Sequence, residues 1–509
     1  MSRTAFWILT GTLLLVLETA RAEPLDAPVA PEAASGLRAV ERLVQAEVET
    51  GKLRSVAFAL VKDGQIVREA AFGWADKEAA AAATVHTPYA LASVSKPIMA
   101  TAVMMLSERG RIDLQEGVAR DLPGLNRGFA GNVRQLLGHT SGLTTYARIA
   151  WADQSTGPRA GDTSQLSYVF AAQPPGSLFE YSNLGYGLLG QLVEVRSGQK
   201  LAEFLGAQVF QPLGMRDAAL PDGFDVPARA ARKYDAAGKP LPATWNDTPG
   251  AGNLYASAHD MAVFSAFHLA TEPAAAPSAV LSVAGRRLMQ SHVEPGARYD
   301  YYGGARYGLG WYVRHAPGKE PVVWHEGGMP GASTIVLMLP QRGVAAVVLI
   351  NQTDANDAAQ RFARALVQTV APNFTEGPLD ATQGMARYAG GDDLRGRWVG
   401  HVSVGGRRLP WSLRFDADGT ATVEFSDAAV DATLPARAAL RTLVKDGLVL
   451  GAFEGSLPAA GASPRSGRYL LLRLVRHADA LTGALVAYSS EERLEYLLPF
   501  PARLERPTD

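Results

Sequence analysis

The chain has 509 residues, of which 47% are hydrophobic and 19% charged, a composition typical of a globular protein and not of a disordered or fibrous one. Its 49 basic and 50 acidic residues nearly cancel, and the sequence has no dense run of lysine and arginine, so we expect no nucleic-acid partner. The length exceeds what one compact core supports, so two domains are expected, and the absence of cysteine excludes disulfides and thiolate chemistry.

The chain begins with a short apolar segment. Arg3 precedes residues 5–17, which are mostly apolar, and residues 20–22 (Ala-Arg-Ala) then place small side chains at the spacing that a signal peptidase requires. The run is short for a membrane span, which needs about 20 apolar residues. We therefore interpret residues 1–22 as a cleaved signal peptide, with an uncleaved anchor as the alternative. A bacterial protein that is periplasmic or secreted, with no membrane span after cleavage, is expected.

Residues 23–375 carry the signals of a mixed domain. After a lead-in at 23–37, a helix is predicted to about Glu49, and an Asp-Gly turn joins two strands, 55–61 and 65–73, into a hairpin. Further helices are predicted at about 93–109, 184–196 and from 258 onward, followed by strands at 333–339 and 344–350 and a last helix at about 355–370. A sheet that opens and closes the domain, with helices between, indicates an α+β fold.

The residue pattern of the sequence changes after about residue 371, where Ala-Pro and Gly-Pro pairs indicate a linker. From 390 to 509, short alternating runs such as 420–425 and 468–474 are separated by turns, which predicts a small all-β domain, either a sandwich or a barrel. Asp416 and Asp418 are interpreted as turn formers and not as calcium ligands, because the longer loop pattern of a calcium site is missing.

Ser93 and Lys96 form the sharpest local feature. Three positions apart on a predicted helix, they lie on one face, one turn from each other. A serine hydroxyl needs a nearby base to become a nucleophile, and a lysine amine can serve if burial lowers its pKa. A Ser-x-x-Lys segment alone equally describes a solvated helix start, so its meaning depends on context.

Two further segments supply that context. Tyr181-Ser182-Asn183 precedes an apolar helix, where a buried tyrosine and a helix-capping asparagine are the structural alternative. His325-Glu326-Gly327-Gly328 lies on a glycine-rich strand, where backbone can approach a ligand closely, and a turn with a surface histidine is the alternative there.

In this order, the three motifs resemble those of serine β-lactamases and low-molecular-mass penicillin-binding proteins, and a Tyr-x-Asn middle motif is similar to the class C β-lactamase and DD-peptidase branch. Three flanking segments also resemble that family: 136–143, 211–215 and 307–311. The likeness covers about residues 37–370 and implies a β-lactamase/transpeptidase-like domain, an antiparallel sheet flanked by helices. Gly396-Arg397-Trp398 resembles the start of the lipocalin-like barrels sometimes appended to this family.

The resemblance implies a role for each motif residue. Ser93 would attack the substrate carbonyl and form an acyl-enzyme, while Lys96 and Tyr181 would shuttle protons. Asn183 would bind the substrate amide. The third motif would bind substrate through His325, Gly327 and Gly328, with the backbone N–H groups of Ser93 and Gly328 as an oxyanion hole.

One position departs from the β-lactamase pattern, which usually has Lys-Thr-Gly where this chain has His325-Glu326-Gly327. A lysine there is a fixed positive charge for a substrate carboxylate, whereas a histidine is mostly neutral above pH ~6.5. The resemblance therefore favours a serine hydrolase acting on a D-amino-acid-containing peptide. A class C-like β-lactamase, a carboxylesterase and a penicillin-binding sensor without turnover remain alternatives.

The expected partners are thus small peptide, β-lactam or ester substrates, and no cofactor is expected. The nine histidines show no metal-ligand spacing, so no metal is expected either. His139 is interpreted as a residue that orders a loop and not as a catalytic one.

Overall fold

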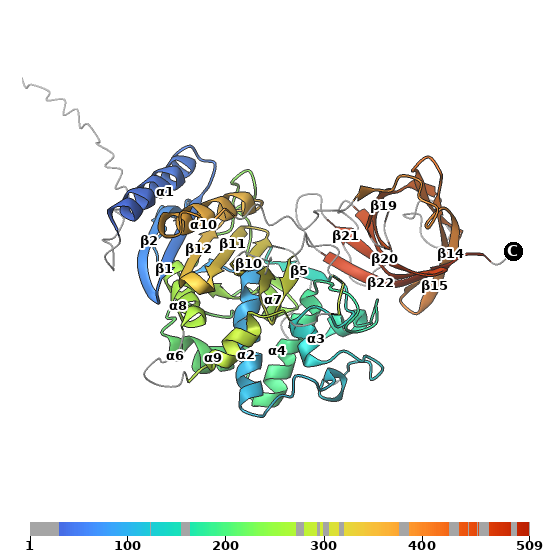
Figure 1. The fold of residues 1–509 in the computed structure, drawn as a ribbon, viewed down its shortest axis with the longest axis horizontal. Coiled ribbons are helices and arrows are strands. Elements are labelled where there is room, and N and C mark those ends of the chain that lie inside the picture. The colour runs from blue at the N-terminus through green and yellow to red at the C-terminus, as the bar shows by residue number, and fades with distance from the viewer. Residues whose placement is uncertain are drawn as a thin grey trace, which may run out of the picture.

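The computed structural model describes residues 30–122, 124–153, 163–270, 279–292, 296–298, 305–314, 320–375, 386–426, 437–445, 447–455, 457, 468–489 and 496–507. They form a domain of helices around a sheet and a second domain built of strands, shown in orange and red in Figure 1. An α+β domain followed by a small all-β domain was predicted, and this is confirmed. The predicted signal peptide and the centre of the predicted linker lie outside the described residues.

The first domain is organised by an eight-stranded antiparallel sheet in the order β3-β2-β1-β12-β11-β10-β9-β8. Its strands are β1 Ser55–Lys62, β2 Gln65–Asp76, β3 Ala81–Ala82, β8 Arg306–Tyr307, β9 Tyr312–Arg314, β10 Val322–Met329, β11 Ala332–Leu339 and β12 Val344–Ile350. The hairpins predicted from both ends of the domain therefore meet at the centre of the sheet, where β1 pairs with β12.

Each face of the sheet carries its own apolar core because side chains alternate along a strand. Phe58 and Leu60 of β1 face the helices α1 (Pro31–Glu49) and α10 (Asn356–Val370), which cover one side of the sheet in Figure 1. Ala57 and Ala59 face the opposite core. The first helix begins six residues earlier than predicted, because Pro31 at its first turn starts a helix well and Ala33 is buried.

The other face is covered by three longer helices: α2 Ser95–Glu108, which contains Lys96, α4 Asn183–Ser197, which begins at Asn183, and α8 Ala258–Leu269. Smaller helices complete this side: α3 Val133–Leu137, α5 Leu201–Leu205, α6 Gln211–Leu213, α7 Pro249–Gly252 and α9 Val283–Met289. Residues 95–106 of α2 are all buried, so this helix runs through the middle of the domain. Among the described residues, none of the helices combines the length and the apolar character that crossing a membrane requires.

The second domain is a curved antiparallel sheet in the order β13-β18-β19-β20-β21-β22-β14-β15-β16-β17. Its strands are β13 Ala386–Arg387, β14 Gly396–Val404, β15 Arg407–Phe415, β16 Ala421–Phe425, β17 Arg437–Ala439, β18 Arg441–Lys445, β19 Leu448–Glu454, β20 Arg468–His477, β21 Ala480–Ser489 and β22 Tyr496–Glu505. Asp418 accepts hydrogen bonds from Thr420 in the turn before β16, as expected of a turn former.

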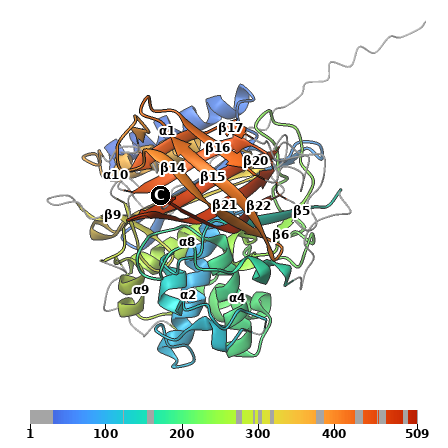
Figure 2. The same ribbon diagram turned by 90° about the vertical axis from the view of Figure 1, so that its right-hand side faces the viewer.

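Strand pairing joins the two domains. Strand β5 (Ala147–Trp151) of the first domain pairs with β22 through Ala147 and Arg148, and on its other side with β6 (Thr244–Asn246). Figure 2 shows β5 and β6 beside β22 at the edge of the second domain. This cross-domain pairing was not predicted, because β5 is short and lies in a loop-rich part of the sequence.

Candidate active site

Ser93 lies in a short helical turn, η1 (Ala92–Val94), immediately before α2. Ala92 has a φ of 48°, a left-handed conformation that costs a residue with a side chain about 1–3 kcal/mol. The turn is held by its neighbours: the N–H of Leu91 donates to the carbonyl of Leu254 (2.9 Å), and the Thr334 hydroxyl on β11 donates to the carbonyl of Leu91 (2.8 Å). The sheet therefore fixes the strained turn that presents Ser93.

Lys96 is fully buried beneath Ser93 and touches three oxygens. Its Nζ lies 3.1 Å from Ser93 Oγ, 2.7 Å from Asn183 Oδ1 and 2.9 Å from the Ala251 carbonyl. Burial lowers the pKa of Lys96 well below its usual value, which favours the neutral amine. Asn183 Oδ1 and the Ala251 carbonyl each accept a hydrogen bond from this amine. In the neutral form, which has two hydrogens, the lone pair is therefore left for the hydroxyl of Ser93.

Asn183 orients this lysine. It is the first residue of α4, and the Ser182 hydroxyl caps the helix by accepting a hydrogen bond from the N–H of Gly185. The Asn183 amide group donates to the carbonyl of Tyr146 (3.1 Å), which turns Oδ1 toward Lys96. The predicted contact of Asn183 with the substrate stays a prediction, and the side chain does line the pocket beside Ser93.

Tyr181 lies in an aromatic cluster around Lys96. The centre of its ring is 4.7 Å from Lys96 Nζ, 4.3 Å from the ring of His139 and 6.3 Å from that of Tyr312, to which it is parallel. The three predicted catalytic side chains, Ser93, Lys96 and Tyr181, are thus gathered at one place by η1, α2 and the segment before α4.

His139 holds the segment that carries Tyr181. Its Nδ1 accepts a hydrogen bond from the N–H of Ser182 (3.1 Å), and its carbonyl accepts one from the N–H of Glu180 (2.8 Å). Burial, with Lys96 nearby, lowers the pKa of His139 well below its usual value, so the ring is neutral. These contacts agree with its interpretation as a loop-ordering residue.

The third motif forms the end of β10 that faces Ser93. Strand β9 pairs only with residues 322–324 of β10, so within the described chain residues 325–329 pair on one side only, with β11. His325 is 1% exposed; the hydroxyl of Tyr307 donates to its Nε2 (2.8 Å), and its Nδ1 donates to the Glu326 carbonyl (2.7 Å). Burial lowers the pKa of His325 to about 3, so the ring is neutral. Its predicted contact with substrate stays a prediction.

The two glycines of this motif have different surroundings. A Cβ on Gly327 would lie 2.3 Å from the carbonyl of Leu91 and 2.2 Å from Thr334 Oγ1, so only glycine lets β10 approach the nucleophile turn. Gly328 is exposed and, with Ser93, lines a pocket of about 80 Å³, where the predicted oxyanion hole would lie. The other lining residues are Ala92, Ala147, Ile149, Asn183, Asn246, Thr248, Ala251, Gly252 and Met329.

Sequence reasoning missed one polar wall of the pocket. Asn246 donates its amide to Asn253 Oδ1 (2.6 Å), and its own Oδ1 accepts the hydroxyl of Thr248 (3.0 Å). Strand β5 was not predicted either. It contributes Ala147 and Ile149 to the pocket and pairs with β22 of the C-terminal domain. Asn246 contacts residues two and seven positions away outside any periodic pattern, and β5 pairs with a strand distant in the chain, so no sequence signal marks either.

The Beta-lactamase family model matches residues 40–370, and the chain therefore belongs to the Beta-lactamase family, within the serine β-lactamase and penicillin-binding-protein superfamily. This confirms the resemblance inferred from the motifs. Among curated proteins, Protein flp of Staphylococcus aureus strain N315 is 24% identical over 324 residues, 61% of this chain and 62% of flp. Penicillin-binding protein 4* of Bacillus subtilis strain 168 is 26% identical over 326 residues, 59% of this chain and 69% of that protein. The chain thus spans about six tenths of the length of flp.

Solved structures share the fold. The structure of SurE with D-Leu aligns with a TM-score of 0.62 at 24% identity and covers 92% of this chain and 100% of SurE, so the likeness extends into the C-terminal domain. The D-amino acid amidase from Ochrobactrum anthropi SV3 complexed with L-phenylalanine amide aligns with a TM-score of 0.55 at 23% identity, over 66% of this chain and 99% of the amidase.

Proposed function

We propose that this protein is a serine hydrolase that cleaves an amide bond of a D-amino-acid-containing peptide through an acyl-enzyme on Ser93. The observation that carries the proposal is the set of contacts around Lys96: a buried amine with two hydrogen-bond acceptors, and its third contact, at 3.1 Å, with the serine hydroxyl. This arrangement supplies the base that a serine nucleophile needs.

In the acylation step, Ser93 Oγ attacks the carbonyl carbon and its proton moves to Lys96 Nζ. The carbonyl oxygen becomes an oxyanion, which the backbone N–H groups of Ser93 and Gly328 stabilise. The C–N bond then breaks. The departing amine takes a proton from the Tyr181 hydroxyl, and Lys96 replaces it with the proton that it received from Ser93. The net proton transfer of acylation is therefore from the Ser93 hydroxyl to the departing amine.

In the deacylation step, water attacks the ester carbonyl carbon. Tyr181 takes a proton from that water as it passes its own phenol proton to the neutral amine of Lys96, and Lys96 gives a proton to Ser93 Oγ as the ester C–O bond breaks. The acid product is released, and the site returns to its starting protonation. Tyr181 thus acts on leaving group and water alike, which distinguishes its role from that of Lys96.

Three observations support a D-amino-acid-containing substrate. A relative over the matched region is a penicillin-binding protein, and a D-amino acid amidase shares the fold. The ring of His325 is neutral, so the third motif lacks the fixed charge that suits a β-lactam carboxylate. The pocket beside Ser93 is small and has apolar members, Ala147 and Ile149, which suits a small side chain such as a methyl group.

Rates on three substrates test the proposal: a D-Ala-D-Ala peptide, a p-nitrophenyl ester and nitrocefin, each with Ser93→Ala as the control. We expect the peptide to be turned over with a higher kcat/KM than nitrocefin, and all turnover to vanish in Ser93→Ala. An inert peptide with rapid ester turnover would make the protein a carboxylesterase. Stable labelling by fluorescent penicillin without any hydrolysis would make it a sensor.

We also propose that the chain is exported through cleavage after Ala22. The support is the short apolar segment after Arg3 and the small residues at positions 20 and 22. The mass of the mature protein recovered from the bacterial periplasm or medium tests this, and a chain that keeps its first 22 residues would refute it.

A further inference from the structure

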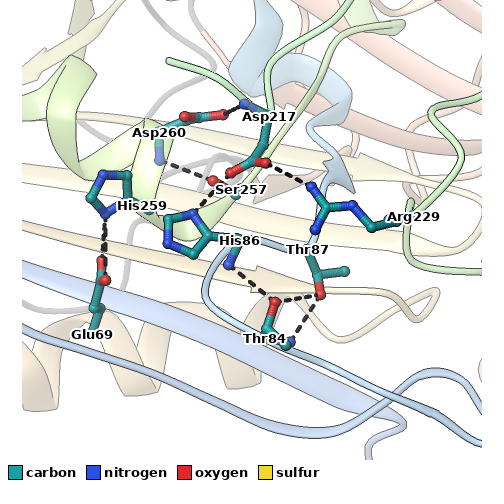
Figure 3. A network of polar contacts seen from close by, with 9 residues as sticks. All are labelled: Glu69, Thr84, His86, Thr87, Asp217, Arg229, Ser257, His259 and Asp260. Atoms are coloured by element: carbon teal, nitrogen blue, oxygen red, sulfur yellow. Dashed lines mark hydrogen bonds and ion pairs between the residues drawn. The ribbon is translucent and has the colours of Figure 1, made fainter. Parts of the chain in front are cut away.

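A second cluster of reactive side chains lies outside the catalytic site. Glu69 on β2, His86 in the loop before β4 (Tyr89–Ala90) and His259 in the first turn of α8 place one potential ligand atom each within 4.8 Å of the others. Figure 3 shows the carboxylate of Glu69 below His259, with His86 beside them. These residues are far apart in sequence, which is why their spacing predicts no metal.

The contacts of His86 prepare it as a ligand. Its Nδ1 donates to Asp217 Oδ2 at 3.0 Å, which leaves Nε2 with its lone pair available. Histidine ligands of metal ions commonly donate their other N–H to a carboxylate, which fixes the ring and its tautomer. Asp217 is held in turn, because its N–H donates to Asp260 Oδ2 at 3.0 Å. The carboxylate of Asp217, which binds His86, therefore belongs to a residue whose backbone is fixed by a further hydrogen bond.

His259 and Glu69 supply the other two ligand positions. The carboxylate of Glu69 is buried and lies 3.0 Å from Nδ1 of His259. Two ligands on one tetrahedral zinc ion lie about 3.3 Å apart, given bonds of about 2.0 Å, so this pair already has the required separation. The His86 side chain is 51% exposed and has room to move the remaining distance.

The local charge also favours a cation. Glu69, Asp217 and Asp260 bring carboxylates to the cluster. The guanidinium of Arg229 lies 3.4 Å from the carboxylate of Asp217, but the Arg229 side chain is 78% exposed. Two imidazoles and a carboxylate form a ligand set suited to zinc.

We propose that Glu69, His86 and His259 bind a divalent ion of the zinc type, that Asp217 orients His86, and that water completes the coordination. The ion replaces the proton between His259 and Glu69, so binding releases protons and weakens as the pH falls.

The position of the cluster indicates a structural role. Strand β4 pairs with β7 (Tyr255–Ala256), and the N–H of His259 donates to the carbonyl of Val85 (3.2 Å) just beyond this pair. His86 and His259 therefore lie at one end of a two-stranded ladder, whose other end leads into the turn of Ser93 and to Ala251 beside Lys96. An ion would fasten the outer end of the ladder that supports the nucleophile turn.

The test is zinc binding to the full chain, prepared without a histidine tag and stripped with a chelator. We expect titration calorimetry to give one Zn²⁺ per chain, Co²⁺ to give the visible absorption bands of a histidine-ligated ion, and Zn²⁺ to raise the melting temperature. His86→Ala and Glu69→Gln should each weaken binding at least about 10-fold, and Asp217→Asn by about 10-fold. The matched control, His401→Ala, removes another histidine on the C-terminal sheet and should bind as the parent does.

His86 is half exposed, so its alanine variant is expected to fold even if the buried positions do not tolerate change. Absence of stoichiometric binding at neutral pH would overturn the proposal and leave a plain ion pair between protonated His259 and Glu69. Binding that persists unchanged in His86→Ala would overturn it as well.

Discussion

Arg473, on β20 of the C-terminal domain, lies 2.6 Å from the carboxylate of Glu180, the residue directly before Tyr181. The Glu180 carboxylate also accepts a hydrogen bond from the Thr144 hydroxyl (2.9 Å), and its side chain is only 7% exposed. The C-terminal domain thus supplies the charge that balances a buried acid next to the proposed proton shuttle. Together with the pairing of β5 and β22, this makes the C-terminal domain a support of the active-site wall.

The first prediction concerns this ion pair. Arg473→Ala leaves the charge of Glu180 buried without its partner, and breaking a buried pair in this way costs roughly 3 kcal/mol. We expect a loss of that order in urea unfolding and a fall in kcat greater than the change in KM, because the segment of Tyr181 loses its support. Arg503→Ala is the matched control, since its pair with Glu505 is equally short but 57% exposed on both sides. Equal behaviour of the two variants would contradict the assigned support.

The second prediction concerns the pH dependence of acylation. Because burial lowers the pKa of Lys96, the acylation rate should become level well below the pH at which an ordinary lysine loses its proton, and it should fall as the pH drops through that lowered pKa. An unperturbed lysine would instead require a pH near 10.4. Stopped-flow labelling with a fluorescent penicillin measures the profile. Lys96→Ala should slow labelling about 100-fold or more, and Lys52→Ala, at an exposed position, should not.

The third prediction separates Tyr181 from Lys96. Tyr181→Phe keeps the ring that packs against His139 and Tyr312 but removes the hydroxyl. We expect deacylation to slow about 100-fold while labelling of Ser93 changes much less, so that the acyl-enzyme accumulates and is visible by intact mass. A fully active Tyr181→Phe would make the proton-shuttle role untenable.

Local patterns predicted the parts of the site that each motif contains, but not the contacts between them. The spacing of Ser93 and Lys96 predicted that their side chains meet, although Ser93 lies in η1 and only Lys96 lies on α2. The Asp-Gly turn after Lys62 correctly predicted the first hairpin. The third contact of Lys96, the carbonyl of Ala251, arises only when α7 packs on α2, so no local signal marks it.

The neutral state of His325 shows the same limit. A histidine was expected from its type to be mostly neutral above pH ~6.5. Its burial beneath Tyr307 lowers the pKa much further, and that burial depends on β8 reaching the sheet edge. Glu69, His86 and His259 likewise meet only in the fold. Periodicity predicts elements, whereas the coordination of a buried group depends on how elements pack.

The fourth prediction uses the close approach at Gly327. In Gly327→Ala, the methyl group would meet the carbonyl of Leu91 and the Thr334 hydroxyl at less than contact distance, so β10 must move away from the nucleophile turn. We expect turnover to fall at least about 100-fold, as a displacement of about 1 Å does at an active site. Gly206→Ala is the control, since its added methyl meets nothing within 4 Å. Wild-type turnover in Gly327→Ala would show that the approach is dispensable.

The last prediction concerns Lys233, a buried lysine that the proposed mechanism does not use. Its Nζ donates to the Thr244 hydroxyl (2.5 Å) beside Met329 of the pocket, and burial lowers its pKa to about 7. The unfolded chain keeps a lysine pKa near 10.4, so between pH 7 and 10 the unfolded state binds more protons and stability rises with pH. Lys233→Met removes this dependence. We expect the variant to be more stable than the parent at pH 7 in urea unfolding, with the difference shrinking by at most about 1.4 kcal/mol per pH unit up to pH 10. A constant difference across that range would mean that Lys233 keeps its ordinary charge when buried.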